Sequence, residues 1–279
     1  MISVLQLGVL DYATGLRLQQ KLVELRKEGR IGDVLLLLEH SPVITLGRNA
    51  KASNIIASSR ELSDRGVEVF ESDRGGDVTF HGPGQLVGYP IFDLRAFPST
   101  DRKRQTLGIV DYVRRLEEVL IRSCAEFGIQ TERVCGLTGV WTGTKHAGTA
   151  APGCAGEQSS AQDLKTEQAK IAAIGVHVSR SVTSHGFALN IDTDLSYFNL
   201  IIPCGIASKP VTSMAKVLGK SMDIEKVTNS VVRNFGDVFH SQILWMETLD
   251  ALLGETVGVP LRAPAELREI HKEEDTLWA

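Results

Sequence analysis

The residue with the clearest chemical potential is Cys204, which stands between Pro203 and Gly205. A flanking glycine lets the backbone bend around a reactive thiol and leaves an amide N–H to face an oxyanion. A cysteine thiol has a pKa of about 8.5, so a nearby ammonium group would be needed to favour the nucleophilic thiolate. Cysteines are also common as small, inert, buried residues, and the tripeptide by itself leaves both interpretations open.

A second group of candidates lies between Asp73 and Leu94, a stretch with five glycines, two prolines, one arginine and one histidine. Glycines this dense let the backbone approach a ligand closely and adopt positive φ. Apolar residues such as Val78 and Val87 favour a strand on either side. Arg74 and His81 are therefore candidate polar groups of a binding site, although a glycine-rich turn with a surface arginine would show the same pattern.

The twelve residues from Arg74 to Gln85, RGGDVTFHGPGQ, resemble the signature of the lipoyl(octanoyl) transferases, the octanoyltransferases of lipoate biosynthesis. The family pattern Arg-Gly-Gly-x-x-Thr-x-His-Gly-Pro-Gly-Gln is filled at all of its fixed positions. Two later segments are similar to family motifs and occur in the expected order, KIAAIG from Lys170 and HGFALN from His185. The likeness extends from about Gly8 to about Lys216.

The resemblance implies an acyltransferase in which Cys204 and Lys170 are catalytic. The Cys204 thiolate would attack the thioester of octanoyl-acyl-carrier protein, and a specific lysine of a lipoyl domain would then attack the octanoyl-enzyme to give an amide. Lys170, which matches the family's lysine, would favour the thiolate and serve as general acid and base. Gly205 would donate its N–H to the oxyanion. Because conversion of a thioester to an amide is downhill, we expect no ATP, metal or other cofactor.

The same resemblance assigns a channel for the octanoyl chain, with Arg74 and His81 at its polar end. Burial of the chain's six methylenes at about 0.8 kcal/mol each would contribute about 5 kcal/mol before ordering costs. We expect His177 and His185 to be hydrogen-bonded structural residues without a catalytic role. The substrate-binding residues implied are Arg74, Gly75, Gly76, Asp77, Val78, Thr79, Phe80, His81, Ala173, Ile174, Gly175, Gly186, Phe187 and Ala188.

The partners implied are octanoyl-acyl-carrier protein as donor, and the lipoyl domains of 2-oxoacid dehydrogenase complexes and the glycine cleavage H protein as acceptors. Acyl-carrier proteins are acidic, so a basic face is expected. Arg102, Lys103 and Arg104 form a dense basic cluster near the signature, although a solvated loop would explain them equally well.

Two alternative functions are an ATP-dependent lipoate protein ligase or amidotransferase, and a catalytically silent acyl-binding protein. A ligase needs no cysteine nucleophile, and a silent protein would be expected to lack Cys204 or Lys170. The presence of both residues favours the transferase.

Composition sets further bounds. The chain has 279 residues, 43% of them hydrophobic, and a formal net charge of −4. A broad nucleic-acid-binding surface is therefore not expected. Its four cysteines form no Cys-x-x-Cys pair, which favours unpaired thiols in a reducing compartment over a zinc site. We recognise no signal peptide, transit peptide, bilayer-length apolar run or extended heptad, and expect a cytoplasmic monomer without membrane attachment.

Hydrophobic periodicity indicates the elements that must position these residues. Apolar spacing of about 3.6 predicts helices, and short apolar or alternating runs predict strands. The resemblance implies an α+β fold, a mixed sheet packed with helices as in biotin and lipoate protein ligases. The predicted helices are 12–28, 107–127 and 224–239, and the predicted strands are 2–10, 34–38, 43–46, 67–70, 131–134, 170–178 and 184–191.

Two segments depart from the family pattern. Residues 142–169 are rich in small and polar residues, and we expect an exposed, mobile loop inserted just before Lys170. His146 and Cys154 lie in it, and a tolerated insertion is favoured over a metal or redox site. The expected organisation is a catalytic domain over residues 1–245 that includes this loop, followed by a C-terminal extension over residues 246–279.

Overall fold

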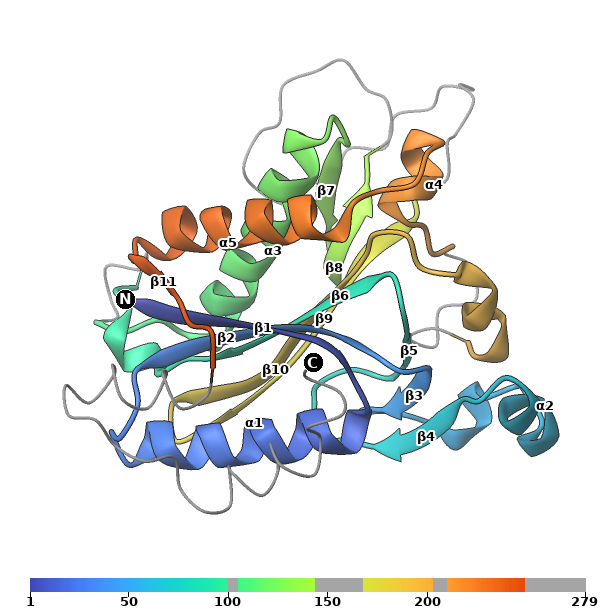
Figure 1. The fold of residues 1–279 in the computed structure, drawn as a ribbon, viewed down its shortest axis with the longest axis horizontal. Coiled ribbons are helices and arrows are strands. Elements are labelled where there is room, and N and C mark those ends of the chain that lie inside the picture. The colour runs from blue at the N-terminus through green and yellow to red at the C-terminus, as the bar shows by residue number, and fades with distance from the viewer. Residues whose placement is uncertain (100–104, 144–167, 203–209, 249–279) are drawn as a thin grey trace.

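Two sheets carry the chain in the computed structural model, which describes residues 1–99, 105–143, 168–202 and 210–248 (Figure 1). The larger sheet has the order β11-β1-β2-β6-β10-β9-β8-β7, and the smaller has the order β4-β3-β5. β1 pairs in parallel with β2 and β11, and the other pairs of the large sheet are antiparallel. The large sheet comprises β1 Ile2–Leu10, β2 Asp33–His40, β6 Gln85–Ile91, β7 Thr131–Val134, β8 Leu137–Thr142, β9 Lys170–Ser179, β10 Val182–Asn190 and β11 Ile243–Trp245.

The small sheet lies beside one end of the large one and delivers the glycine-rich signature. β3 pairs in parallel with β4 and antiparallel with β5. β5 carries the middle of the signature, and β6 begins at its last residue, Gln85, after a short turn. The small sheet comprises β3 Val43–Leu46, β4 Glu68–Glu71 and β5 Val78–His81.

Every described α-helix except α3 begins at a side chain that accepts a hydrogen bond from one of its first N–H groups. Asp11 accepts a hydrogen bond from Thr14 N–H ahead of α1, and Asp223 accepts one from Glu225 N–H ahead of α5. The helices are α1 Tyr12–Lys27, α2 Ser59–Asp64, α3 Ile109–Glu126, α4 Met214–Leu218 and α5 Ile224–Phe239, with 3-10 turns at Ala52–Asn54, Leu94–Ala96 and Leu195–Leu200.

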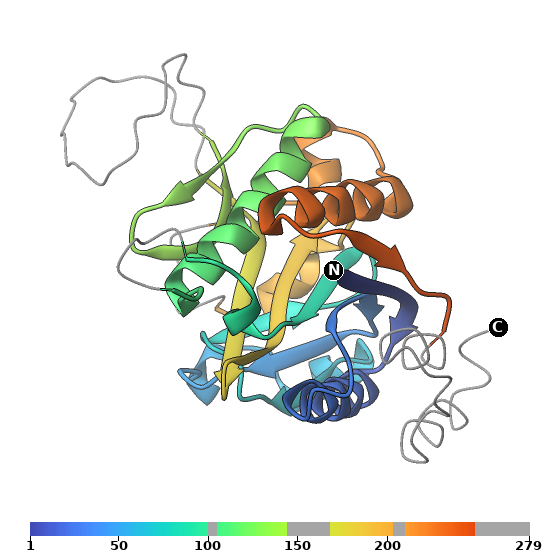
Figure 2. The ribbon, with the colours of Figure 1, turned by 90° about the vertical axis from the view of Figure 1, so that its left-hand side faces the viewer.

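Helices cover both faces of the large sheet. Figure 2 shows α3 and α5 over one face and α1 under the other. This arrangement explains the continuous apolar run of β2, because alternate residues must be buried on opposite faces. Leu35 and Leu37 pack in the core beneath α3 and α5, while Leu36 and Leu38 pack in the core against α1. A third core, around Ile44 and Phe80, lies under the small sheet.

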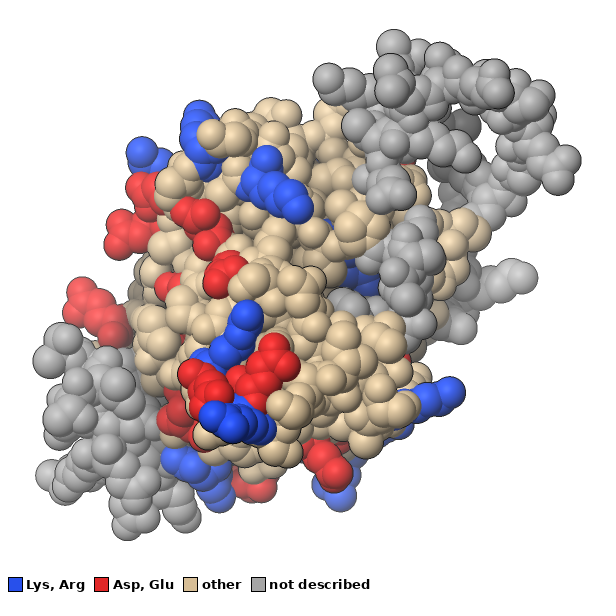
Figure 3. All heavy atoms as spheres, turned by 90° about the vertical axis from the view of Figure 1, so that its right-hand side faces the viewer, with Lys and Arg blue, Asp and Glu red and all other residues tan. Residues whose placement is uncertain are grey.

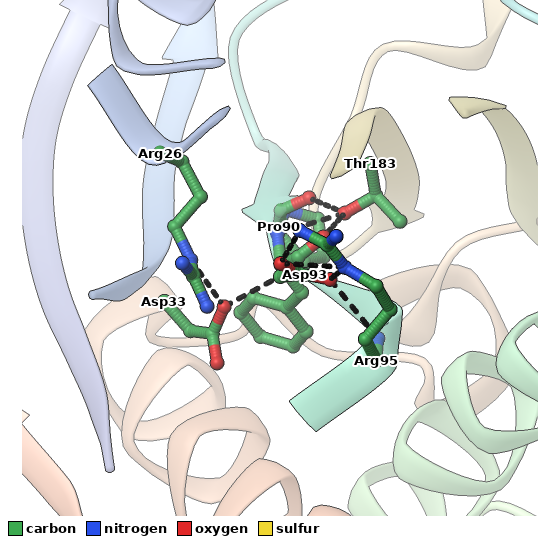
Figure 4. Close-up of polar contacts among 7 residues, drawn as sticks. Arg26, Asp33, Pro90, Asp93, Arg95 and Thr183 are labelled. Carbon is green, nitrogen blue, oxygen red and sulfur yellow. Dashed lines mark hydrogen bonds and ion pairs between the residues drawn. The ribbon is translucent and has the colours of Figure 1, made fainter. Parts of the chain in front are cut away.

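A cluster of polar side chains lies at the C-terminal end of β6 (Figure 4). Pro90 stands in an interior strand and has no N–H to donate, and its carbonyl accepts a hydrogen bond from Thr183 Oγ1 at 2.7 Å. Beyond it, Asp33 Oδ1 accepts from Asp93 N–H at 2.8 Å and from Arg26 Nε at 2.9 Å. The cluster ties α1, β2, β6 and β10 together at this end of the sheet.

The mixed-sheet α+β architecture confirms the fold class expected from the sequence. α5 has the predicted bounds, and α3 begins two residues later than predicted because Gly108 is its N-cap. Cys124 is fully buried in α3, and burial raises the pKa of its thiol to about 12, as expected of an inert core cysteine. None of the helices within the described ranges is long and apolar enough to cross a membrane. The domain boundaries remain predictions.

Candidate active site

A cavity of about 340 Å³ lies where the small sheet meets the α1-covered face of the large sheet. Its floor is formed by β6, β9 and β10, and its wall by the first half of the signature and the start of α1. Val87 and Tyr89 line it and also belong to the α1-side core, which identifies the face. The cavity is therefore built from segments that are far apart in the chain.

All but one of the predicted substrate-binding residues line this cavity, as does Lys170. Phe80 does not. It is buried under the small sheet, where its ring stacks on Tyr197 with centroids 4.7 Å apart. The residues that line the cavity are Arg74, Gly75, Gly76, Asp77, Val78, Thr79, His81, Ala173, Ile174, Gly175, Gly186, Phe187 and Ala188.

Arg74 organises the signature loop around its guanidinium group. Nε donates to Thr45 Oγ1 at 3.0 Å, and Nη2 donates to the carbonyls of Thr45 at 2.7 Å and Asp77 at 2.6 Å. Nη1 donates to the Gly75 carbonyl at 3.1 Å. With only 8% of its surface exposed, Arg74 holds the loop against β3. The charge is thus compensated by oxygens of the protein itself.

The signature loop packs directly on the backbone of β9. Gly75 N–H donates to the Val176 carbonyl at 3.0 Å. A Cβ atom at Gly175 would come within 2.7 Å of the Gly75 carbonyl oxygen, closer than real Cβ atoms approach. Glycine is required here because two backbones meet without room for a side chain.

Lys170 begins β9 and is half-buried at the edge of the cavity. Its Nζ lies 4.7 Å from the ring centroid of Trp141 on β8, a cation–π contact. Its backbone N–H donates to the Pro210 carbonyl at 2.8 Å, and its carbonyl accepts from Thr212 N–H at 2.9 Å. Lys170 is therefore held by its backbone and by the strand beside it.

Tyr12, Tyr89 and His185 line the cavity away from Lys170 and were not predicted as site residues. His185 pairs with Val176, six residues along β9 from Lys170, or about 20 Å at strand spacing. Its Nε2 lies 2.7 Å from Asp73 Oδ1, and this hydrogen bond with the nearby imidazoles lowers the pKa of Asp73 to about 2. Tyr12 is a helix-start residue with no sequence signal for a site, whereas the HGFALN motif could have pointed to His185.

His81 is buried and uncharged. Desolvation, followed by the neighbouring charges of His40 and Arg74, lowers its pKa to about 3. Its Nδ1 lies 2.7 Å from Gln85 Oε1, and its Nε2 lies 3.4 Å from Thr45 Oγ1. The imidazole is a neutral polar group in the cavity wall.

Several predicted functional residues lie outside the described residues. These include the nucleophile Cys204 and the oxyanion donor Gly205. The basic cluster of Arg102, Lys103 and Arg104 and the insertion residues His146 and Cys154 lie outside them too. Their roles stay predictions. In the described ranges, no group of three or more His, Cys, Asp or Glu side chains could hold a metal ion.

The face that carries the small sheet and α2 mixes both signs of charge among its described residues (Figure 3). Arg60 and Asp64 of α2 form an exposed pair at 3.7 Å, and Arg65 lies 5.3 Å from the ring centroid of Tyr197. Exposed pairs of this kind contribute little stability. Interspersed charges keep this face from being uniformly basic.

Comparison with known proteins shows that the chain is similar to lipoyl protein ligase A/B domains and to octanoyltransferases. Residues 11–236 match the family described as the lipoyl protein ligase A/B catalytic domain. The chain is 57% identical over 274 residues to the octanoyltransferase of Koribacter versatilis, covering 98% of each chain. It is 54% identical over 256 residues to the octanoyltransferase of Acidobacterium capsulatum, covering 91% of this chain and 96% of that one.

Among solved structures, the bipartite lipoate protein ligase of Thermoplasma acidophilum, from a study of that ligase and its E2 lipoyl domain, is similar in fold. The TM-score is 0.62 at 16% sequence identity, over 95% of this chain and 98% of that one. At this identity the similarity concerns the fold alone.

Proposed function

Because this chain belongs to the octanoyltransferases, acyltransferases that share the lipoyl protein ligase A/B catalytic domain, we propose that it carries octanoyl groups from acyl-carrier protein to lipoyl domains through a thioester on Cys204. The observation that carries this proposal is the cavity with Lys170 at its edge. The cavity supplies a site for the chain, and Lys170 supplies an ammonium group for the chemistry.

The cavity wall suits a saturated acyl chain. Val87, Ile174, Phe187 and Ala188 give it apolar surface, and burial of the chain there would contribute about 0.8 kcal/mol for each methylene. The buried polar groups of the wall are already hydrogen-bonded within the protein, as Arg74 and His81 illustrate. An acyl chain can therefore displace water from the cavity without leaving these groups unpaired.

In the first step the Cys204 thiolate attacks the thioester carbonyl of octanoyl-acyl-carrier protein. A new C–S bond to Cys204 forms, the C–S bond to the carrier's thiol breaks, and that thiolate leaves and takes up a proton. The Lys170 ammonium favours the attacking thiolate and can supply this proton. Lys170 is suited to this role because the Trp141 ring attracts its ammonium form at 4.7 Å.

In the second step the amine of an acceptor lysine attacks the octanoyl-enzyme. A C–N bond forms, the C–S bond to Cys204 breaks, and the attacking nitrogen loses a proton. Neutral Lys170, left by the first step, takes this proton and becomes the ammonium again. The cycle closes without ATP, because the thioester already carries the activation.

The acceptor is proposed to be a lysine on a lipoyl domain. The support is family membership, together with a fold shared with a lipoate protein ligase studied alongside its E2 lipoyl domain. That second relation is one of fold and carries less weight than the sequence relation to the octanoyltransferases.

Intact-protein mass spectrometry tests the proposal. The protein is mixed with octanoyl-acyl-carrier protein without ATP, as wild type, Cys204→Ala and Cys204→Ser. The expected result is a gain of one octanoyl group on wild type that hydroxylamine removes and a lipoyl domain discharges, with no gain on Cys204→Ala. Cys204→Ser can form a hydroxylamine-resistant ester.

Two outcomes would contradict the proposal. Octanoate incorporated into a lipoyl domain only when ATP is supplied, with no octanoyl-enzyme, would indicate a ligase. No adduct and no transfer under either condition would indicate an acyl-binding protein.

A further inference from the structure

A continuous line of buried hydrogen bonds connects His81 with the backbone beside Lys170. His81 Nδ1 lies 2.7 Å from Gln85 Oε1, and Gln85 Nε2 lies 2.8 Å from Asn190 Oδ1. Asn190 Nδ2 in turn lies 3.0 Å from the Thr212 carbonyl. Gln85 and Asn190 are 2% and 4% exposed, so solvent does not compete for these partners. The line joins β5, β6 and β10 to the segment that pairs with the start of β9.

Chemistry fixes the direction of every bond in this line. A peptide carbonyl can only accept, so Asn190 must turn its NH2 group to Thr212 and its oxygen to Gln85. Gln85 must then turn its NH2 group to Asn190, a choice reinforced by the Phe80 carbonyl 3.3 Å from the same nitrogen. Its oxygen is left facing His81, and an oxygen without a proton needs a donor. His81 Nδ1 must therefore carry a hydrogen.

The other side of the imidazole is compatible with this assignment. Thr45 Oγ1 accepts from Arg74 Nε at 3.0 Å, whereas the two hydrogens of Arg74 Nη2 have shorter contacts with the carbonyls of Thr45 and Asp77. The hydroxyl keeps its own hydrogen, which it can donate to His81 Nε2 at 3.4 Å. With the hydrogen of the neutral ring on Nδ1, Nε2 is able to accept it.

We propose that Gln85 and Asn190 are positioning residues that lock His81 as its neutral Nδ1–H tautomer, and thereby hold it against Thr45, the residue that anchors Arg74 in the cavity wall. These two amide side chains act through His81 and do not touch the reacting atoms. The line of hydrogen bonds also ends on Thr212, whose N–H donates to the Lys170 carbonyl at 2.9 Å. One set of amide side chains thus ties the signature to the backbone of the proposed catalytic lysine.

The surroundings of His81 support a neutral ring. The groups facing it are Arg74 from the signature loop, His40 on β2, His185 on β10 and the phenol of Tyr12 on α1. None of these is an anion near neutral pH, since burial also raises the pKa of Tyr12. Burial with these neighbours lowers the pKa of His81 to about 3, so the tautomer is constant across the working range of pH.

Nitrogen-15 NMR of the imidazole rings tests the proposal without substrate. Long-range proton–nitrogen correlations distinguish the two neutral tautomers from the cation, and His81→Gln assigns the signal among seven histidines. We expect wild-type His81 to be Nδ1–H from pH 6 to pH 8. Gln85→Met removes the acceptor at similar volume and should make the Nε2–H tautomer detectable. Gln85→Glu keeps an oxygen facing Nδ1 and should keep that nitrogen protonated.

Kinetics provide the functional readout, which alone rests on the proposed octanoyl transfer. We expect Gln85→Met to lower kcat/KM by about threefold to tenfold, mainly through KM for the octanoyl donor, and Gln85→Glu to restore part of the loss. The matched control is Asn234→Leu, since Asn234 is a buried amide on α5 that donates to the Ser230 carbonyl and Glu126, far from this line of hydrogen bonds. It should lower stability and leave the His81 signal and kcat/KM of the folded enzyme unchanged.

The tautomer proposal is overturned if wild-type His81 is Nε2–H or doubly protonated, or if Gln85→Met leaves a pure Nδ1–H signal. The positioning role is overturned if the tautomer changes while kcat/KM does not. Failure of octanoyl transfer in every variant would count against the proposed function and leave the NMR result to stand by itself.

Discussion

On the face of the large sheet under α3 and α5, aromatic rings pack against one another in a continuous apolar core, whereas the face toward α1 and the small sheet gathers buried charged and amide groups around a cavity of about 340 Å³. The first face also buries Glu117 and Asn234, which are hydrogen-bonded within and beside the helices. The polar side buries Arg74, His81, His185, Gln85 and Asn190. The aromatic side consists of Phe92, Phe97, Tyr112, Phe187, Phe235 and Phe239.

The difference follows from the directionality of the two kinds of contact. Apolar packing is non-directional and scales with buried area, so the aromatic side supplies stability and tolerates rearrangement. Buried polar groups must each find a partner with the right geometry, so the cavity side specifies one arrangement at a cost in stability. Phe187 belongs to both sides, because it lines the cavity and its ring lies 5.9 Å from that of Phe235.

The largest expected effect is on the cavity side. Lys170→Met keeps the aliphatic stem and removes the ammonium, so octanoyl transfer should fall by about 10²-fold to 10⁴-fold, as for other general acid–base residues. The thermal midpoint should change little, since the side chain is only half-buried. Single-turnover measurement of octanoyl transfer tests the first expectation, and a thermal melt tests the second. A loss of less than threefold would remove Lys170 from the chemistry.

On the aromatic side we expect the opposite result, a loss of stability with little loss of activity. Phe235→Ala removes a fully buried ring that packs on Phe92, Phe187 and Phe239, and should lower the free energy of unfolding by about 3–5 kcal/mol. Activity per folded molecule should stay within about twofold at low temperature. Urea unfolding and an activity assay on the folded fraction measure both. A loss of activity per folded molecule well beyond twofold would mean that the aromatic face and the cavity face do not act separately.

A smaller effect is expected at Trp141, which is buried in the core and also contacts the proposed catalytic residue Lys170. The ring holds the Lys170 ammonium and is itself buried. Trp141→Leu should lower kcat by about 2-fold to 30-fold, the worth of a cation–π contact, whereas Trp141→Phe keeps a weaker π face and should lose less. Steady-state kinetics of the two variants at matched folded concentration test this order. Equal kcat in both variants would show that the ring acts only by filling space.

The smallest expected effect concerns Asp73 and pH. The hydrogen bond from His185 lowers the pKa of Asp73 from 3.8 to about 2, so its contribution to stability is present above about pH 4 and is lost as pH falls toward 2. The side chain is 55% exposed, so screening should hold the contribution below about 1 kcal/mol. Urea unfolding of wild type and Asp73→Asn at pH 5 and pH 3 measures it. The prediction is wrong if Asp73→Asn loses more free energy of unfolding between pH 5 and pH 3 than the wild type does.

The sequence by itself determined the longer elements and much of the cavity lining, but not short strands such as β11. α5 and β3 have the predicted bounds because their apolar patterns are long or flanked by clear breaks. The twelve-residue signature predicted binding-site residues directly, since most of its members line the cavity. Strand alternation could also have set Phe80 apart, because Thr79 and His81 share one face of β5 and Phe80 takes the other.

Only the tertiary structure decided which distant residues meet. Tyr12, Tyr89 and His185 reach the cavity from α1, β6 and β10, and nothing in local spacing relates a helix-start tyrosine to a histidine 173 positions later. The tautomer of His81 likewise depends on Thr45, Gln85, Asn190 and the Thr212 carbonyl, which come together through the pairing of two sheets. Local propensity fixes where elements begin and end, but hydrogen-bond direction and side-chain meeting points are set by packing across the chain.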